Sequence, residues 1–290
     1  MQHLRLGKWN TLEVVRQVDF GYYLDCGDLG DVLLPIKEAP ATGLNIGDEV
    51  DVFLYLDSEE RLIATTLRPK VEVNEFAFLE VKWVNQYGAF LDWGLLKDLF
   101  CPFREQKMRM QVGKKYIIYC YIDSVTYRIV ASAKVEKFLS KEMPEYTYGQ
   151  EVEALVQHKT ELGFKCIVDG KYSGQLFNNE IFGHIETGQR LKAYVKNVRT
   201  DAKIDLIMQQ GGMDHVRDFA NTLLSYIQQC PEQQTIFCDK SLAEDIYNQF
   251  GVSKKTFKRA VGDLYKQGLI TISDNGLALT EKGRFVGCED

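Results

Sequence analysis

Aromatic side chains lie beside a glycine at two separate places in the chain, and this pairing could bind nucleic acid. Phe20 and Tyr23 lie on either side of one glycine, and Tyr87 and Phe90 lie on either side of another. Flat rings on a protein surface stack on the bases of single-stranded nucleic acid, at about 1–3 kcal/mol per base. The alternative is that the rings fill a hydrophobic core. Alternation along a strand predicts that Phe90 points outward if its two neighbours point inward.

The two glycines, Gly21 and Gly88, have a counterpart in Gly163, and each opens the second strand of a repeated pattern. The interval from this glycine to the one that opens the fourth strand is 26, 25 and 25 residues in the three repeats. Five short strands in about 60 residues predict a small oligonucleotide-binding (OB) barrel, which binds ligands on the exposed side of its second and third strands. A single large β-sandwich would not explain the near-constant interval.

The pattern changes after residues 209–212. Apolar residues then recur at helical spacing from Asp214 towards Pro231, and further helices are expected over 241–250 and 254–267. Two strand-like runs follow around an Asn-Gly turn at 275–276, which predicts a hairpin. This order predicts a winged form of the helix-turn-helix.

The expected fold is therefore mainly β with a C-terminal α+β module: three tandem five-stranded OB barrels and a winged helix. The expected domains are residues 1–69, 70–135, 146–210 and 213–286. The loops at 69–73 and 134–148 are the expected joints, and Trp83 and Trp93 are expected to serve packing.

The third of these helices has an apolar stripe and a basic side. Phe257, Val261 and Leu264 form the stripe. A recognition helix places its nucleic-acid contacts near its N-terminal half, where the candidates are Lys254, Lys255, Lys258 and Arg259. A solvated charged face explains these residues equally well, and a winged helix can also dock a protein.

The repeats resemble the RNA-binding S-one (S1) domain, whose signature is aromatic-Gly-Ala-Phe-hydrophobic, a later histidine, and an aspartate with an arginine four residues on. Residues 87–91 (YGAFL) match the first element closely, 20–24 (FGYYL) match it well, and 162–166 (LGFKC) match it poorly. Asp57 and Arg61 fit the last element, whereas the second repeat has Asp123 and Arg128, one position further apart. Pro35, Pro102 and Phe177 replace the histidine.

The order of repeats followed by a winged helix resembles the bacterial conserved virulence factor B family. The resemblance implies RNA binding and an effect on gene expression rather than catalysis. Phe20, Tyr23, Tyr87 and Phe90 would then stack bases. Arg61, Arg128 and Lys203 would bind the phosphate backbone of the RNA. Asp57 and Asp123 would orient an arginine or accept a hydrogen bond from a base. The third repeat lacks the rings but is more basic, through Lys165, Lys171, Lys192, Lys196 and Arg199.

Composition and the absence of certain motifs exclude several classes of function. The net charge of −6 argues against wholesale electrostatic binding to nucleic acid, so binding must use local patches and stacking. Phosphate-binding glycine motifs and metal-ligand spacings are absent, so we expect neither an enzyme nor a cofactor or metal. The seven cysteines are scattered and no signal or membrane-spanning run occurs, which favours a reducing cytoplasm and no membrane.

The leading hypothesis is a cytoplasmic single-stranded RNA-binding regulator. A DNA-binding transcription factor acting through the winged helix, with duplex DNA as its partner, is the second. A docking scaffold without affinity for nucleic acid is the third.

Overall fold

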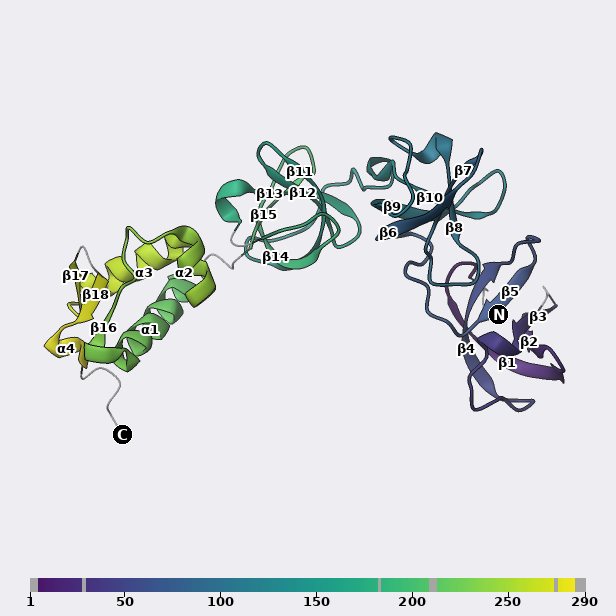
Figure 1. Cartoon of the computed structure of the whole chain (residues 1–290), viewed down its shortest axis with the longest axis horizontal. Coiled ribbons are helices and arrows are strands. Elements are labelled where there is room, and N and C mark those ends of the chain that lie inside the picture. Colours follow the sequence, from purple (N-terminus) through teal and green to yellow (C-terminus); the bar gives the residue numbers. More distant parts are fainter. Residues whose placement is uncertain (1–4, 28–29, 182–183, 209–212, 274–275, 285–290) are drawn as a thin grey trace. The chain divides into compact units, whose positions relative to one another are not determined.

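The chain forms three small β-barrels and a C-terminal winged helix (Figure 1). The computed structural model describes residues 5–27, 30–181, 184–208, 213–273 and 276–284. They divide into two compact units, Met1–Leu139 and Ser140–Asp290. This confirms the predicted fold class. The expected domain junction at 209–212 lies outside the described residues, as do two residues of the expected hairpin turn, 274–275.

The first barrel is closed, in the strand order β1-β2-β3-β5-β4. Its strands are β1 (Trp9–Val18), β2 (Gly21–Asp25), β3 (Asp31–Pro35), β4 (Glu49–Leu56) and β5 (Leu62–Thr65). Alternate residues, such as Leu24 and Leu34, fill its interior. The backbones of β2 and β3 approach closely at Gly21, where an added Cβ would lie 2.3 Å from the carbonyl oxygen of Leu34. Glycine is therefore required where β2 begins.

The second and third barrels repeat this arrangement. The second has β6 (Glu75–Val84), β7 (Gly88–Leu91), β8 (Leu99–Pro102), β9 (Lys115–Ile122) and β10 (Ile129–Ser132). These strands are hydrogen-bonded in the order β10-β9-β6-β7-β8, and β8 also lies beside β10. The third barrel is closed and has β11 (Glu151–Thr160), β12 (Gly163–Val168), β13 (Tyr172–Phe177), β14 (Arg190–Val198) and β15 (Ile204–Ile207). A single 3₁₀ turn follows the third strand of each barrel: Ile36–Glu38, Phe103–Glu105 and Asn178–Glu180.

A β-bulge interrupts the first strand of every barrel. The register with the second strand shifts between Val14 and Arg16 in β1, and between Val81 and Trp83 in β6. The same shift occurs between Val156 and His158 in β11. One extra residue reverses the in-and-out alternation of the strand beyond it. The three residues that follow the bulges are therefore turned to the outside of their barrels, whereas the valines before them are buried.

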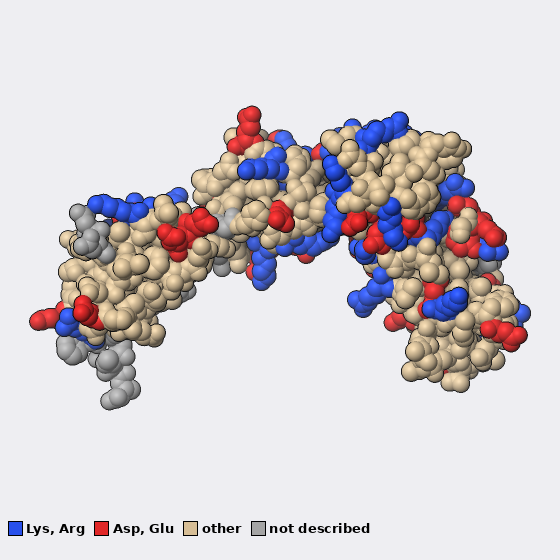
Figure 2. Space-filling view, in the orientation of Figure 1, with Lys and Arg blue, Asp and Glu red and all other residues tan. Residues whose placement is uncertain are grey.

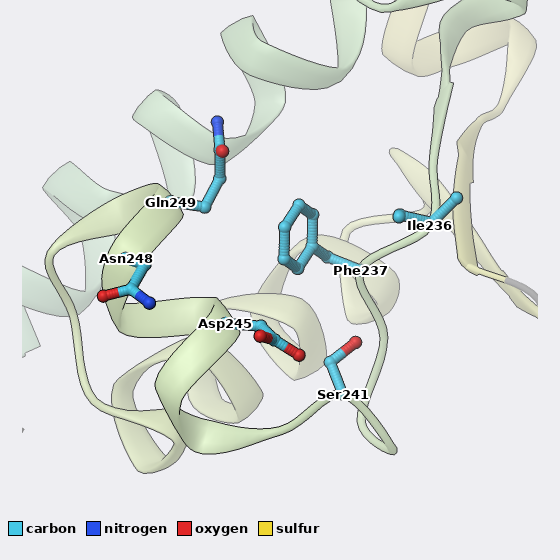
Figure 3. A pocket seen from close by; sticks show the side chains of 6 residues that line it. All are labelled: Ile236, Phe237, Ser241, Asp245, Asn248 and Gln249. Carbon is cyan, nitrogen blue, oxygen red and sulfur yellow. The ribbon is translucent and has the colours of Figure 1, made fainter.

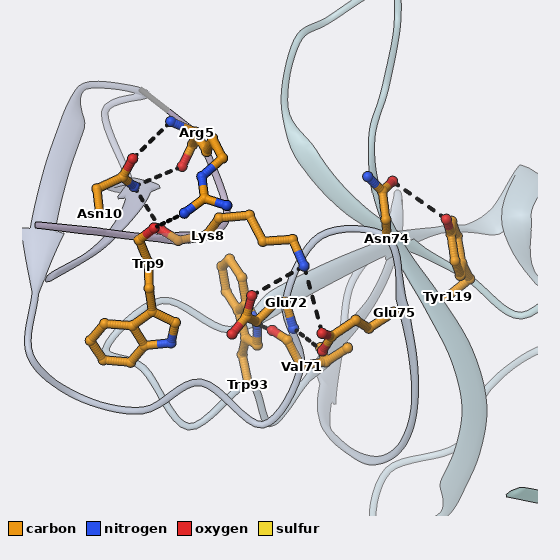
Figure 4. Close-up of polar contacts among 10 residues, drawn as sticks. All are labelled: Arg5, Lys8, Trp9, Asn10, Val71, Glu72, Asn74, Glu75, Trp93 and Tyr119. Carbon is orange, nitrogen blue, oxygen red and sulfur yellow. Dashed lines mark hydrogen bonds and ion pairs between the residues drawn. The ribbon is translucent and has the colours of Figure 1, made fainter. Parts of the chain in front are cut away.

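The first two barrels share one hydrophobic core. Phe53 and Tyr55 on the outer side of β4 are buried against Trp93 of the second barrel. The expected joint at 69–73 is part of this core, since Val71 is buried and its carbonyl oxygen accepts a 2.7 Å hydrogen bond from the Trp93 indole. Figure 4 shows Lys8 reaching from the first barrel to Glu72, at 3.1 Å. Trp93 thus serves packing, as expected.

The C-terminal module has the winged-helix order of elements. Its helices are α1 (Met213–Gln229), α2 (Ala243–Phe250), α3 (Lys254–Lys266) and α4 (Glu281–Arg284), and its strands are β16 (Gln234–Thr235), β17 (Ile270–Ser273) and β18 (Gly276–Leu279). The Ser253 hydroxyl caps α3 by accepting a 2.9 Å hydrogen bond from the Thr256 amide. Phe257 and Leu264 belong to the same buried core as Leu223 of α1, so the opposite side of α3 faces outward. No helix in the described part of the chain is long and apolar enough to span a membrane.

Candidate nucleic-acid interface

A row of three aromatic side chains crosses the outer surface of the second barrel. Trp83, Phe90 and Phe100 are direct neighbours on β6, β7 and β8. The rings of Trp83 and Phe90 stack, with centroids 3.6 Å apart and planes inclined by 4°. Phe100 follows at 4.9 Å from Phe90. Phe90 points outward as predicted but is half-buried between the other two rings, while Trp83 is 44% exposed.

Trp83 packs against Phe90, but it does so on the outer surface of the barrel and not in the interior. The bulge at Lys82 turns the indole out of the barrel and onto the surface row. The indole N–H donates a 3.0 Å hydrogen bond to the carboxylate of Asp98, and this bond holds the ring in one orientation.

Another exposed ring lies at the bend between β6 and β7. Tyr87 is 66% exposed there, and its amide donates to the side chain of Asn85 at 2.8 Å. The carbonyl oxygen of Tyr87 accepts a hydrogen bond from Phe103, whose ring carries the Arg109 guanidinium 3.5 Å from its centroid. The second barrel thus has a cation stacked on a ring in addition to its aromatic row. This is the combination that holds single-stranded nucleic acid.

The first barrel presents a smaller version of this surface. Tyr23 is half-buried and outward-facing, and its register neighbours are Arg16 on β1 and Leu33 on β3. The Arg16 guanidinium lies 4.1 Å from the centroid of the Tyr23 ring. Phe20 is 57% exposed and meets Tyr23 edge-on at 6.5 Å. Arg16, which lies at the position equivalent to Trp83, was not among the residues predicted from the sequence.

Asp57 and Arg61 lie together at the turn between β4 and β5, as the motif implied. The carboxylate of Asp57 accepts hydrogen bonds from Nε and Nη2 of Arg61 at 2.9 and 2.8 Å. Glu59 binds the same guanidinium at 2.9 Å. Partial burial alone would raise the pKa of Asp57, but hydrogen bonds from Arg61 and from the Glu59 amide lower it below its usual value. Arg61 is exposed and oriented, with its charge balanced by two carboxylates.

Asp123 and Arg128 do not form the expected side-chain pair. The Asp123 carboxylate accepts from the amides of Val125 and Thr126 and pairs with Arg104. The Arg128 Nε instead lies 3.0 Å from a carboxylate oxygen of Glu60, in the first barrel. Arg128 therefore contributes to the contact between the first two barrels.

The third barrel has a polar row where the others have rings. Lys165 is in register with His158 and Gln175. The positive charges expected on this barrel are largely neutralised, because carboxylates lie beside the cations. The pairs are Lys203–Asp201 (2.6 Å), Arg199–Asp205 (2.6 Å), Lys196–Glu180 (2.8 Å), Lys192–Glu151 (3.0 Å) and Lys171–Glu142 (3.7 Å).

Of the four basic residues in the N-terminal half of α3, two interact with other groups of the protein and two do not form an ion pair with any described residue. Lys254 donates to the carbonyl oxygen of Ser241 at 2.6 Å, and Lys258 lies 3.7 Å from Asp239. Lys255 and Arg259 are exposed and have no ion pair with any described residue. Figure 2 shows basic side chains gathered along one edge of the winged helix, while both signs of charge are interspersed over the barrels.

A shallow pocket lies between α2 and the segment that precedes it (Figure 3). Its lining is partly apolar and partly polar, and consists of Ile236, Phe237, Ser241, Asp245, Asn248 and Gln249. Within the described ranges, no group of three or more His, Cys, Asp or Glu residues could hold a metal ion.

Tandem OB-type barrels with surface rings, followed by a winged helix, define a protein built from nucleic-acid-binding domains. The family model of the S1 domain matches residues 6–67, and that of the CvfB-like winged helix domain matches residues 221–279. These matches confirm the resemblance of the chain to the conserved virulence factor B family.

Relatives match over most of the chain. The uncharacterized protein YitL of Bacillus subtilis is 28% identical over 96% of this chain and 95% of its own. Conserved virulence factor B of Staphylococcus saprophyticus is 27% identical over 83% of this chain and 82% of its own. A crystal structure of a multidomain protein with nucleic acid binding domains from Streptococcus pneumoniae is 23% identical, covers 95% of this chain and 98% of its own, and has a TM-score of 0.42.

Proposed function

We propose that this protein binds single-stranded RNA in the cytoplasm and regulates gene expression without catalysing a reaction. The aromatic row of the second barrel carries this proposal. Phe90 and Phe100 lie on the second and third strands, with which OB barrels bind oligonucleotides, and Trp83 stacks on Phe90 from the first strand. Tyr87 is exposed at the bend that precedes the second strand. Stacking of about 1–3 kcal/mol per base supplies affinity without a basic surface, which suits a chain with a net charge of −6.

The first barrel is the second contact of the proposed complex. Phe20 and Tyr23 offer ring surface, and Arg16 lies on the same barrel as a cation for the phosphates. Arg61 contributes less than Arg16, because Asp57 and Glu59 balance its charge. The membership of this barrel in the S1 domain family supports RNA rather than DNA as the ligand. Since the third barrel has neither rings in its row nor unbalanced cations among the pairs described above, we assign it a minor part in binding.

Fluorescence anisotropy with labelled oligonucleotides tests the proposal. The ligands are single-stranded RNA and DNA of about 12 nucleotides and a duplex of the same sequence, each at ~50 and ~200 mM salt. Replacing Tyr87→Ala together with Phe90→Ala is expected to weaken RNA binding by about tenfold or more. Lys255→Glu with Lys258→Glu is the matched control and is expected to leave RNA binding close to wild type. Equal loss in both variants would contradict the assignment of RNA to the barrels.

Duplex DNA binding through the winged helix is the second candidate. It is favoured by the exposure of Lys255 and Arg259 on the side of α3 opposite the core. The same experiment separates it from the first, since duplex binding that only the helix variant loses would support a transcription factor. Absence of binding to every oligonucleotide would support a protein scaffold.

The non-catalytic part of the proposal has its own test. End-labelled RNA is incubated with the protein, with and without Mg²⁺, and resolved by electrophoresis. We expect full-length RNA at all times. Shorter products that increase with protein concentration would overturn this part and leave RNA binding standing.

A further inference from the structure

We infer that Trp83, rather than the signature ring Phe90, is the surface on which the second barrel stacks a nucleic-acid base. This rests on the proposed function and assigns its main contact to a residue outside the aromatic-glycine motif. Phe90 is half-buried, with the indole of Trp83 3.6 Å away on one side and Phe100 4.9 Å away on the other. A base cannot reach a face of Phe90 unless one of these rings moves.

Trp83 is presented to solvent in one orientation. Its inner face lies parallel to Phe90 at 4°, and its N–H edge is bound to Asp98. The exposed 44% of the residue therefore belongs to its other face and its remaining edges. Asp98 is itself held by Lys82, at 3.0 Å, so the hydrogen bond to the indole has a fixed acceptor. A ring that is already ordered loses little conformational entropy when a base stacks on it.

The residue of the first barrel that is equivalent to Trp83 supports the same assignment. Arg16 follows the bulge of β1 as Trp83 follows that of β6, and its guanidinium covers Tyr23 at 4.1 Å. In both barrels the residue after the bulge supplies the outermost flat group, and the signature ring lies beneath it. An indole has the larger face for stacking, so the second barrel is the stronger base site.

Binding of oligouridylate RNA to the full-length protein tests the inference, with Trp83→Ala and Trp83→Phe as the variants. Trp83→Ala is expected to weaken binding by about 5- to 100-fold, whereas Trp83→Phe, which keeps a flat ring, stays within about threefold of wild type. Tyr148→Ala is the matched control, because Tyr148 is an exposed ring outside the barrel strands. It is expected to bind like wild type.

Tryptophan emission gives a second measurement that does not depend on the alanine variant. RNA is expected to quench the emission of wild type and to leave that of Trp83→Phe unchanged, because Trp93 is buried and Trp9 packs against Phe53. Wild-type affinity in Trp83→Ala, together with a loss in Tyr87→Ala, would overturn the inference and leave the proposed function intact. If the wild-type protein binds no RNA, the proposed function and the inference both fail.

Discussion

The ring of Trp93 meets that of Tyr55 edge to face, with centroids 6.1 Å apart and planes at 86°, although the two residues belong to different barrels. The ring of Phe53 also meets this indole edge to face, with centroids 5.8 Å apart. Residues 52–55 of β4 are consequently buried on both sides, by their own barrel within and by the second barrel outside. The first two barrels therefore depend on each other for stability.

Trp93→Ala is expected to destabilise both of these barrels. Loss of a buried tryptophan costs about 3–5 kcal/mol, and here it also leaves the carbonyl oxygen of Val71 without its donor. Hydrogen exchange of the full chain should show lost protection in β4 as well as in β7. Leu96→Ala, at an exposed position nearby, is the control and should change little. Loss of protection confined to the second barrel would argue against a shared core.

Gly88→Ala is expected to disrupt the pairing of β7 with β8. The added Cβ would lie 2.4 Å from the carbonyl oxygen of Cys101, so the two backbones must separate, at a cost of about 2 kcal/mol or more. Gly262→Ala is the matched control, because nothing lies within 4 Å of the corresponding position in α3. It should stabilise the protein by about 0.5–1 kcal/mol, since alanine favours a helix. Denaturant unfolding measures both changes, and equal effects would contradict the close approach of the strands.

Asp123→Asn is expected to alter the dependence of stability on pH. Hydrogen bonds from the Thr126 and Val125 amides, and then the charge of Arg104, lower the pKa of Asp123 in the folded protein. Its stabilising effect is therefore complete above the unfolded-state pKa of about 3.9 and disappears as the pH falls through the lower folded value. The variant should be less stable than wild type by about 1 kcal/mol at neutral pH. Urea unfolding across this range should show the difference shrinking towards low pH, whereas a constant difference would contradict the ionic role.

The buried thiols are expected to resist alkylation in the native protein. Burial raises the pKa of Cys26 to about 11 and those of Cys101 and Cys166 to about 12, with Asp25 and Asp31 adding to the effect at Cys26. At pH 8 the thiolate of each is therefore about a thousandth of the total or less. Cys230 is only half-buried and should react before the other five cysteines that the structure describes. Peptide mass spectrometry after iodoacetamide treatment measures this order, and similar rates before and after denaturation would contradict the burial.

The architecture was predictable because it is encoded locally. The close approach of strands at Gly21 and Gly88 requires glycine, and the glycine that opens the long strand of each barrel lies 25 or 26 residues further on. Alternation also predicted the outward direction of Phe90 from its buried neighbours.

Contacts that depend on register or on another repeat were not predictable in this way. Simple alternation along β6 places Trp83 on the same side as the buried Val81, and nothing in the residue types marks the bulge between them. Arg16 was missed for the same reason. The partner of Arg128 is Glu60, which belongs to a different repeat. The Trp93 contacts that tie down the segment at 69–73 are likewise formed only when two barrels meet.

In each barrel, the bulge divides the first strand into a part whose valine faces the interior and a part whose next residue faces the surface. Before it, Val14, Val81 and Val156 must fit an apolar interior, so they can vary little. After it, the side chain is free of that requirement, and the copies hold arginine, tryptophan and histidine. Duplicated barrels can therefore acquire different ligand preferences by one exchange at this place, without remodelling their interiors.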